Sequence, residues 1–142
     1  DRYYNMFNLN KWHQEIIDEL RQSRTLTTPH GRRRVFYDRW PTWREEQERK
    51  GDLFKTAYAN VPQGTACDHI NLGGVRIWNR LPSSCDILIQ CHDELVIQYP
   101  IKYRELVRKV VEEELKHPIY IHGREVVIPI DIDTGQNWKM ED

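Results

Sequence analysis

The sequence predicts an α+β fold, in which helices and a strand hairpin occupy separate stretches of the chain rather than alternating strictly. Two β-rich runs, residues 86–90 and 95–99, are separated by only four residues, a spacing typical of a hairpin. Stretches with apolar residues three and four positions apart precede and follow this pair, as in amphipathic helices.

The N-terminal part predicts one helix followed by a short strand. Residues 9–24 form an amphipathic pattern, and residues 27–31 end it because they contain a Pro and a Gly. Residues 32–37 are expected to form a short strand, and the polar residues 44–52 a connection or an exposed helix. The buried face of the first helix is expected to hold Leu9, Trp12, His13, Ile16 and Leu20.

The central part predicts two helices, residues 53–60 and 65–78, interrupted at residues 61–64 by Pro62 and Gly64. Gly73 and Gly74 each cost about 1 kcal/mol relative to Ala inside a helix. Their use is therefore expected to be the close approach of another backbone.

The C-terminal part predicts a helix over residues 101–116, a strand over residues 125–133 and a polar tail that contains Trp138. The order of elements is therefore helices, hairpin, helix and strand.

Charge is distributed unevenly along the chain. Residues 1–50 hold eleven Lys/Arg and eight Asp/Glu, whereas residues 51–142 hold ten and fourteen. A basic part joined to an acidic part suits a protein that binds an anion and also needs carboxylates, although an ordinary solvated surface gives the same counts.

The composition also limits the class of protein. The length of 142 residues fits one domain. No run approaches the roughly 18 apolar residues of a membrane span, so no membrane partner is expected. Three Cys without the spacing of a zinc site favour a reducing compartment, and we expect a cytoplasmic location.

The informative site is the tip of the hairpin, His92-Asp93-Glu94. Acids beside an apolar hairpin are costly unless they are paired or bind a cation, and Mg²⁺ prefers carboxylates together with phosphate oxygens and waters. Polar residues at hairpin tips also occur simply because tips face solvent. We expect the adjacent Cys91 to be a small buried neighbour rather than a redox site.

Residues 90–96, Gln-Cys-His-Asp-Glu-Leu-Val, resemble the last motif of the family A DNA polymerases. Three further segments match in the same order. Residues 31–34 resemble the Gly-Arg-Arg segment of the family, residues 60–68 resemble its Asn-x-Pro-x-Gln-Gly-Thr-Ala-Ala-Asp segment, and residues 129–138 resemble its C-terminal strand and Gly-x-Asn-Trp ending.

This resemblance implies a palm-subdomain piece, in which an antiparallel hairpin bearing the catalytic Asp packs against several helices and a C-terminal strand. It implies that Asp93 is the catalytic aspartate and a ligand of Mg²⁺, and that Glu94 is a supporting catalytic and metal-binding acid. His92 corresponds to a residue near the primer terminus. The implied reaction is template-directed nucleotidyl transfer by two-metal catalysis, with primer-template DNA and a dNTP as partners. The implied location is the nucleoid or a phage-infected bacterial cell.

The resemblance also implies DNA contacts. Gln63 matches a minor-groove contact, and Asn60 is a second candidate, although one residue fewer than in the family separates the two. Lys55 is a candidate basic contact. The remaining candidates, suited to phosphate contact, are Arg32, Arg33 and Arg34.

The resemblance implies that residues 1–142 form a single partial domain: a helical and basic segment, residues 1–60, that follows the nucleotide-binding helix, then the palm with its catalytic hairpin, residues 61–142. The Asp-Tyr-Ser-type motif and the Lys- and Tyr-bearing helix of the family are absent from the sequence. Because the chain also starts at Asp1 rather than Met, we expect a fragment or one part of a split polymerase, inactive without its N-terminal remainder.

Two other functions stay open. The chain could be a non-catalytic DNA-binding remnant of a polymerase, or a small metal-dependent phosphodiesterase whose further ligands, such as Asp68, Asp131 and Asp133, join His92 through folding. A partial domain would expose an apolar face where the remainder docks, and the candidates for it are Phe7, Trp12, Trp40, Trp43 and Trp78.

Overall fold

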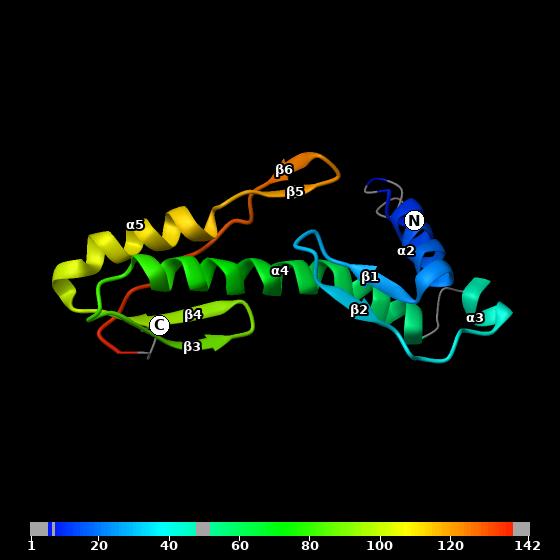
Figure 1. The fold of residues 1–142 in the computed structure, drawn as a ribbon, viewed down its shortest axis with the longest axis horizontal. Coiled ribbons are helices and arrows are strands. Elements are labelled where there is room, and N and C mark those ends of the chain that lie inside the picture. The colour runs from blue at the N-terminus through cyan, green and yellow to red at the C-terminus, as the bar shows by residue number, and fades with distance from the viewer. Residues whose placement is uncertain (1–5, 7, 48–51, 138–142) are drawn as a thin grey trace. The chain divides into compact units, whose positions relative to one another are not determined.

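The computed structural model describes residue 6, residues 8–47 and residues 52–137 (Figure 1). It divides into two compact units, residues 1–68 and 69–142, and helix α4 (Asp52–Arg80) contributes residues to both. Each unit has its own apolar core, so each is described by itself. The mixture of helices and small antiparallel hairpins agrees with the predicted α+β class.

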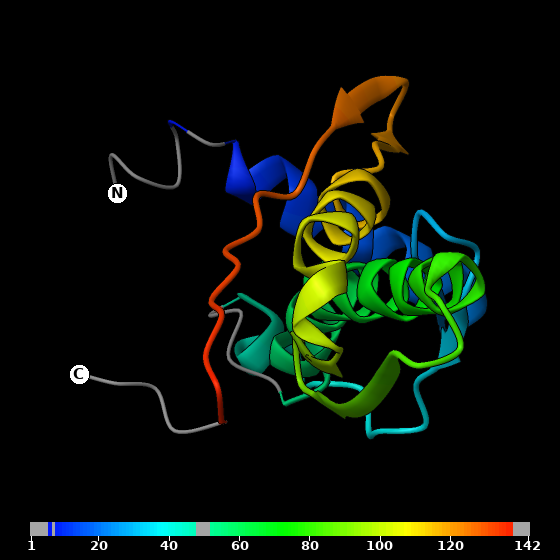
Figure 2. The ribbon, with the colours of Figure 1, turned by 90° about the vertical axis from the view of Figure 1, so that its left-hand side faces the viewer.

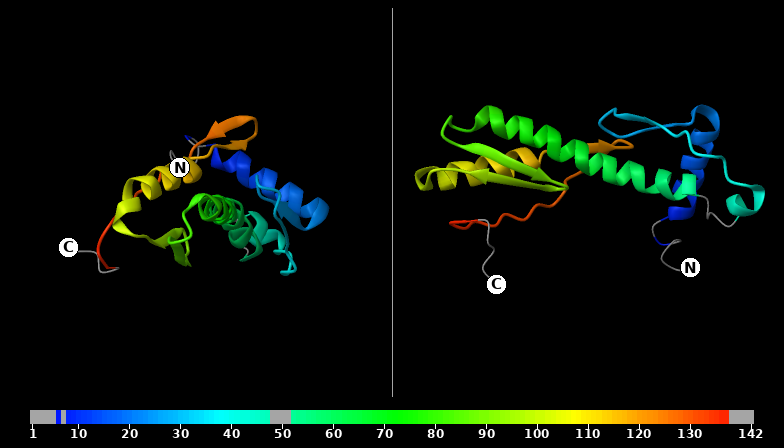
Figure 3. Two further views of the ribbon diagram at one scale, coloured as in Figure 1. Left: turned by 60° about the vertical axis from the view of Figure 1, so that its left-hand side comes forward. Right: turned by 90° about the horizontal axis from the view of Figure 1, so that it is seen from below.

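The first unit is built around one apolar cluster. Helix α2 (Leu9–Ser23) and the first part of α4 pack with a hairpin made of β1 (Thr25–Thr27) and β2 (Arg33–Val35). Figure 3 shows this hairpin running beside the N-terminal half of α4. The buried members of the cluster are Ile16, Ile17, Leu20, Leu26, Phe36, Leu53, Phe54 and Ala57.

Helix α2 confirms the predicted amphipathic pattern. Ile16 and Leu20 are buried and Trp12 packs partly against the same cluster. The helix ends at Ser23 and is capped by Arg24, which takes a left-handed conformation with φ of 54° and donates its backbone N–H to the Leu20 carbonyl at 2.9 Å. That reversal leads directly into β1, a strand that the sequence pattern did not predict.

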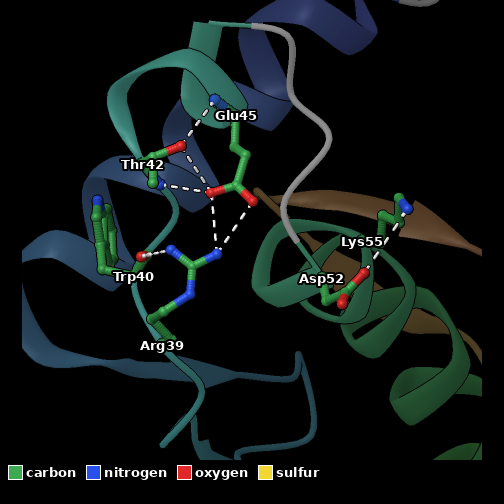
Figure 4. A network of polar contacts seen from close by, with 6 residues as sticks. All are labelled: Arg39, Trp40, Thr42, Glu45, Asp52 and Lys55. Atoms are coloured by element: carbon green, nitrogen blue, oxygen red, sulfur yellow. Dashed lines mark hydrogen bonds and ion pairs between the residues drawn. The ribbon is translucent and has the colours of Figure 1, made fainter.

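The short helix α3 (Trp43–Gln47) occupies part of the segment expected to be a connection or exposed helix. It starts with a capping box, shown in Figure 4, in which Thr42 donates its backbone N–H to Glu45 Oε2 at 2.7 Å and Glu45 donates its own to Thr42 Oγ1 at 3.4 Å. Arg39 Nη2 lies 3.0 Å from both Glu45 carboxylate oxygens. These contacts fix the first turn of a helix with little apolar surface of its own.

The predicted interruption at residues 61–64 is wrong, because α4 runs through Pro62 without a break. A proline inside a helix removes one backbone hydrogen bond and costs about 3 kcal/mol. The apolar pattern outweighs that cost: Leu53, Phe54 and Ala57 are buried in the first cluster, and Val61 also packs against it. Burial therefore continues on the same helix face up to the proline.

The second unit places the C-terminal half of α4 against α5 (Arg104–Leu115) and against the hairpin of β3 (Asp86–Cys91) and β4 (Glu94–Gln98) (Figure 2). The predicted helix over residues 101–116 begins as a 3₁₀ turn, η1 (Ile101–Tyr103). The buried centre of this unit consists of Ile70, Ile77, Val110 and Leu115, with Ile87, Leu95, Ile97 and Ile130 packed against it.

Close approach occurs at Gly73 but not at Gly74, and the nearest atom belongs to a side chain rather than to the predicted backbone. A Cβ built there would collide with Leu115 Cδ2 and stand 3.6 Å from the Glu114 carbonyl oxygen. At Gly74 the nearest atoms are the Leu95 methyl groups, at 3.7 and 3.9 Å, which is ordinary contact. Gly73 is therefore the position that lets the end of α5 pack onto α4.

The predicted strand over residues 125–133 is wrong over most of its length. Strand β6 (Arg124–Val126) pairs only with β5 (Ile119–Ile121), and residues 127–133 form no strand. Pro129 has no backbone N–H to donate to a sheet, and Ile130 instead packs against the second core. The chain therefore contributes apolar contact here rather than a sheet edge.

The five candidate aromatic residues have different environments. Trp12 and Trp40 pack partly against the first cluster, whereas Trp43 and Trp78 are 77% and 54% exposed. Phe7 lies outside the described residues, as does Trp138 of the predicted tail. In the part of the chain that the structure describes, no helix is long and apolar enough to cross a membrane.

Candidate catalytic hairpin and basic groove

The β3–β4 hairpin presents His92 and Asp93 at its end as a two-residue connection, because Cys91 and Glu94 already pair with each other. His92 takes a left-handed conformation with φ of 54°, which costs a non-glycine residue about 1 kcal/mol or more. The pairing shifts register between Ile87 and Ile89, a bulge of the kind that re-aims side chains near functional sites.

Apolar packing holds the hairpin in place behind its tip. Ile87 on β3 and Leu95 and Ile97 on β4 pack against the second core, close to Ile77 and Val110. Leu95 is next in sequence to Glu94, so the anchored part of β4 begins immediately beyond the acidic tip. The tip therefore projects from a support whose position is fixed by buried contacts.

The side chains of His92, Asp93 and Glu94 are all exposed. Among the described residues, no hydrogen bond or ion pair engages the side chain of any of the three. Asp93 belongs to the turn and Glu94 to the strand, so the two carboxylates leave the backbone in different directions. Cys91 is exposed as well, which corrects the expectation of a buried neighbour: it lies on the face of β3 that the second core does not cover.

Carboxylate oxygens are the ligands that Mg²⁺ prefers, and Asp93 and Glu94 can offer two of them without first breaking an ion pair. Within residues 6, 8–47 and 52–137, no group of three or more His, Cys, Asp or Glu could hold a metal ion. Asp131 and Asp133 accordingly do not complete a site with His92. The tip has the chemistry of a partial metal site.

A second candidate site is a groove of about 640 Å³ within the first unit. It brings together five of the predicted DNA-binding residues, from the β1–β2 hairpin and from α4. The residues that line it are Thr28, Arg32, Arg33, Arg34, Thr56, Ala59, Asn60, Gln63, Gly64 and Cys67. Lys55 is not among them; it is exposed and lies 3.7 Å from Asp52 Oδ1, as Figure 4 also shows.

The three arginines of the groove differ in what they contact. Arg34 donates to the Asn60 side-chain oxygen at 2.9 Å, and its guanidinium lies 5.0 Å from the centre of the Phe36 ring. Arg32 forms an ion pair with Asp68 and donates to the Gly64 carbonyl. The side chain of Arg33 is exposed and makes no hydrogen bond or ion pair with the rest of the described chain. Of the three arginines, Arg33 is therefore the one whose guanidinium has no acceptor among the described residues.

Gln63 is exposed on α4 and lines the groove, whereas Asn60 is half-buried and already accepts a hydrogen bond from Arg34. The backbone beside Gln63 lies close to the β1–β2 turn, since a Cβ on Gly64 would stand 3.1 Å from Thr28 Cγ2. Gln63 is thus the amide more available to an incoming ligand.

One contact at the groove was not expected from the sequence: Thr28, which lines the groove, had no assigned role, and Asp68, which does not line it, was considered only as a possible metal ligand. Thr28 Oγ1 donates to Asp68 Oδ2 at 2.8 Å, across forty positions of sequence. No local spacing links such a pair, and the sequence shows only that Asp68 stands at the end of the segment 60–68 that also contains Gln63.

The family model and the related proteins that match this chain all belong to DNA polymerases. The model of the family described as DNA polymerase family A matches residues 1–140. The thermostable DNA polymerase I proteins of Thermus filiformis and Thermus aquaticus are each 29% identical over 97% of this chain, and the DNA polymerase I of Bacillus subtilis is 25% identical over 97%. The chain spans 16% of the length of each of these relatives.

A solved structure also shares the fold. The POL domain of Pol1 from M. smegmatis, in complex with DNA primer-template and dNTP, superimposes with a TM-score of 0.69 at 21% identity. The match covers 82% of this chain and 21% of that one.

Proposed function

Since this chain belongs to DNA polymerase family A, we propose that it is the C-terminal palm part of a template-directed DNA polymerase. In this proposal residues 61–142 supply the catalytic hairpin and residues 1–60 supply a basic, helical segment that binds DNA. Nucleotidyl transfer requires the remainder of the polymerase, either on the same chain or as a separate subunit.

The observation that carries this proposal is the exposed tip at Asp93 on a hairpin anchored by Ile87, Leu95 and Ile97. The Asp93 carboxylate is exposed, and no cation of the described residues forms an ion pair with it. Glu94, one residue further, adds a second carboxylate. When bound, two divalent ions such as Mg²⁺ would activate the primer 3′-hydroxyl and stabilise the leaving pyrophosphate.

The tip alone offers too few ligands for two ions, so a further carboxylate has to come from outside the described residues. The sequence contains no Asp-Tyr-Ser-type motif, and the chain spans 16% of its relatives' length. The missing acid is therefore assigned to the remainder of the polymerase. The hairpin contributes a fixed position for one half of a shared site.

Binding of primer-template DNA is assigned to the basic groove. Arg33 offers a guanidinium to phosphate, and Gln63 offers an amide to base edges in the minor groove, where the acceptor pattern is nearly independent of sequence. The related structure, which contains DNA primer-template and dNTP, supports these two partners for this chain. His92, exposed at the tip, is assigned to the primer terminus.

Primer extension tests the catalytic role. The chain is mixed with the remainder of the Thermus aquaticus polymerase, truncated where its match to this chain begins, and extension of a labelled primer is measured with Mg²⁺. We expect Asp93→Asn to slow extension about 100-fold or more, which corresponds to ~3 kcal/mol of the barrier. Asp86→Asn is the matched control, because it makes the same charge change at the opposite, exposed end of β3.

Extension by the Asp93→Asn mixture at the rate of the unsubstituted mixture would disprove the metal-binding role of this residue. A mixture that extends no primer favours a second function, a non-catalytic DNA-binding module. The groove motivates it, because all the residues that line it belong to the first unit. Such a module binds duplex with strong salt dependence and no need for Mg²⁺. The phosphodiesterase alternative has no supporting cluster of ligands in the described residues.

A further inference from the structure

We propose that Asp68 is a positioning residue for DNA binding: it fixes the turn of residues 28–32 on α4. In this arrangement Arg32 makes contacts within the protein, and Arg33 is left to bind the DNA. The inference rests on the proposed function, which assigns DNA to the basic groove, and it adds different roles for Arg32 and Arg33.

The Asp68 carboxylate uses both of its oxygens inside the first unit. Oδ1 forms an ion pair with Arg32 Nε at 2.9 Å, and Oδ2 accepts a hydrogen bond from Thr28 Oγ1 at 2.8 Å. The Asp68 side chain is only 12% exposed, and Thr28 is buried. The partly buried hydrogen bond from Thr28 is charge-assisted, which makes it stronger than a neutral one, and the ion pair adds a contact to Arg32, so this carboxylate contacts both ends of the turn.

The turn is closed by its own hydrogen bonds as well. Thr28 and Arg32 exchange two of them: the Thr28 N–H donates to the Arg32 carbonyl at 2.9 Å, and the Arg32 N–H donates to Thr28 Oγ1 at 3.2 Å. Gly31, with φ of 87°, supplies the left-handed residue that this loop needs. Because Arg33 follows directly as the first residue of β2, the placement of the turn decides where its side chain starts.

Arg32 is held from a second side by α4. Its Nη2 donates to the Gly64 carbonyl at 3.0 Å, and a Cβ on Gly64 would stand only 3.3 Å from the same nitrogen. Arg32 therefore has two acceptors on α4. Arg33 has none among the described residues, so it can take up a phosphate without breaking a contact in the protein.

The negative charge of Asp68 distinguishes a positioning role from a purely electrostatic effect on DNA binding. Asp68 is an acid beside a groove assigned to a polyanion, so by charge alone it weakens DNA binding. If charge were its whole effect, removing the carboxylate would tighten binding. If it acts by positioning, removing the carboxylate weakens binding although the chain becomes more positive.

The test is duplex binding by the full chain, measured by fluorescence anisotropy of a labelled primer-template at several salt concentrations. We expect Asp68→Asn to raise the Kd about tenfold, the size of losing one charge-assisted hydrogen bond. Thr28→Val, which leaves the charge unchanged but removes the hydroxyl of the same contact, should weaken binding in the same direction. Circular dichroism at the assay temperature identifies variants that remain folded, and Thr28→Val carries the test if Asp68→Asn does not fold.

A double-mutant cycle provides the readout that a merely structural role would not move. Arg33→Ala should weaken binding in the unsubstituted chain and lower the slope of log K against log salt by about 1. In the Asp68→Asn background, or in Thr28→Val, the same change should cost less, because Arg33 is no longer held in place.

Tighter or unchanged binding by folded Asp68→Asn, or strictly additive effects in the cycle, would overturn the positioning role while leaving DNA binding intact. Absence of duplex binding by the unsubstituted chain would instead overturn the assignment of DNA to the groove, and this inference with it.

Discussion

Gly73→Ala and Gly74→Ala are expected to change the stability of the second unit in opposite directions, although they are the same substitution at neighbouring positions of one helix. Each replaces a helical glycine by alanine, which alone stabilises a helix by about 1 kcal/mol. The two positions differ in what the new methyl group meets. At Gly73 it collides with Leu115 Cδ2, whereas at Gly74 it lies in ordinary contact with the Leu95 methyl groups, at 3.7 and 3.9 Å.

The collision at Gly73 cannot be relieved cheaply, because Leu115 is buried among Ile70, Ile77 and Val110. Overpacking of this kind costs about 1–3 kcal/mol. Taking ~2 kcal/mol for the collision and ~1 kcal/mol for the gain in helix propensity, Gly73→Ala should lower the free energy of unfolding by about 1 kcal/mol. Gly74→Ala should raise it by about 1 kcal/mol.

Urea unfolding followed by circular dichroism measures both changes. The difference between the two variants is the sharper quantity, because the propensity gain is common to both and cancels, leaving ~1–3 kcal/mol of overpacking. Equal stability of the two variants would refute the close packing of α5 on α4 at Gly73. Adding Leu115→Ala to Gly73→Ala should remove the collision, so the two substitutions should not be additive.

Two further predictions concern charged groups. The backbone N–H of Thr42, together with its hydroxyl, lowers the pKa of Glu45 to about 2. The start of α3 is therefore fully stabilised above pH 4.5 and loses this support as the pH falls towards 2. An NMR titration of the Thr42 amide should give a midpoint near 2, and a midpoint near 4.5 would refute the capping contact. Glu114→Gln should destabilise the second unit by about 1–3 kcal/mol, because it weakens the acceptor of the partly buried Arg76, whereas Glu113→Gln, at the surface, should cost less than about 1 kcal/mol in thermal unfolding.

Local patterns predicted the elements whose signals lie within a few residues of each other. Helix α2 followed from its apolar spacing, and the β3–β4 hairpin followed from two β-rich runs with a short connection. The break expected at Pro62 did not occur because burial of Phe54 and Ala57 fixes the helix before the proline is reached. That burial depends on a partner helix elsewhere in the sequence, so a local rule could not include it.

The candidate site was predictable to a similar extent. The motif around Asp93 identified the acidic tip, and its exposure agrees with that prediction without testing the catalytic role. The sequence could not predict the different environments of Arg32, Arg33 and Arg34, because all three are arginines at consecutive positions. They depend on acceptors that α4 places beside the turn, from Asn60 to Asp68, at least twenty-six positions further along the chain.

The brevity of the hairpin tip has a consequence for insertions and deletions. With only two residues between the paired Cys91 and Glu94, the loop has no spare length to absorb an added residue. An insertion there would either lengthen the loop or shift the register of β4 by one residue. A longer loop would move Asp93 away from the anchored strands, whereas a register shift would turn Leu95 away from the core. Loop length, as much as the identity of the acid, therefore determines where its charge lies.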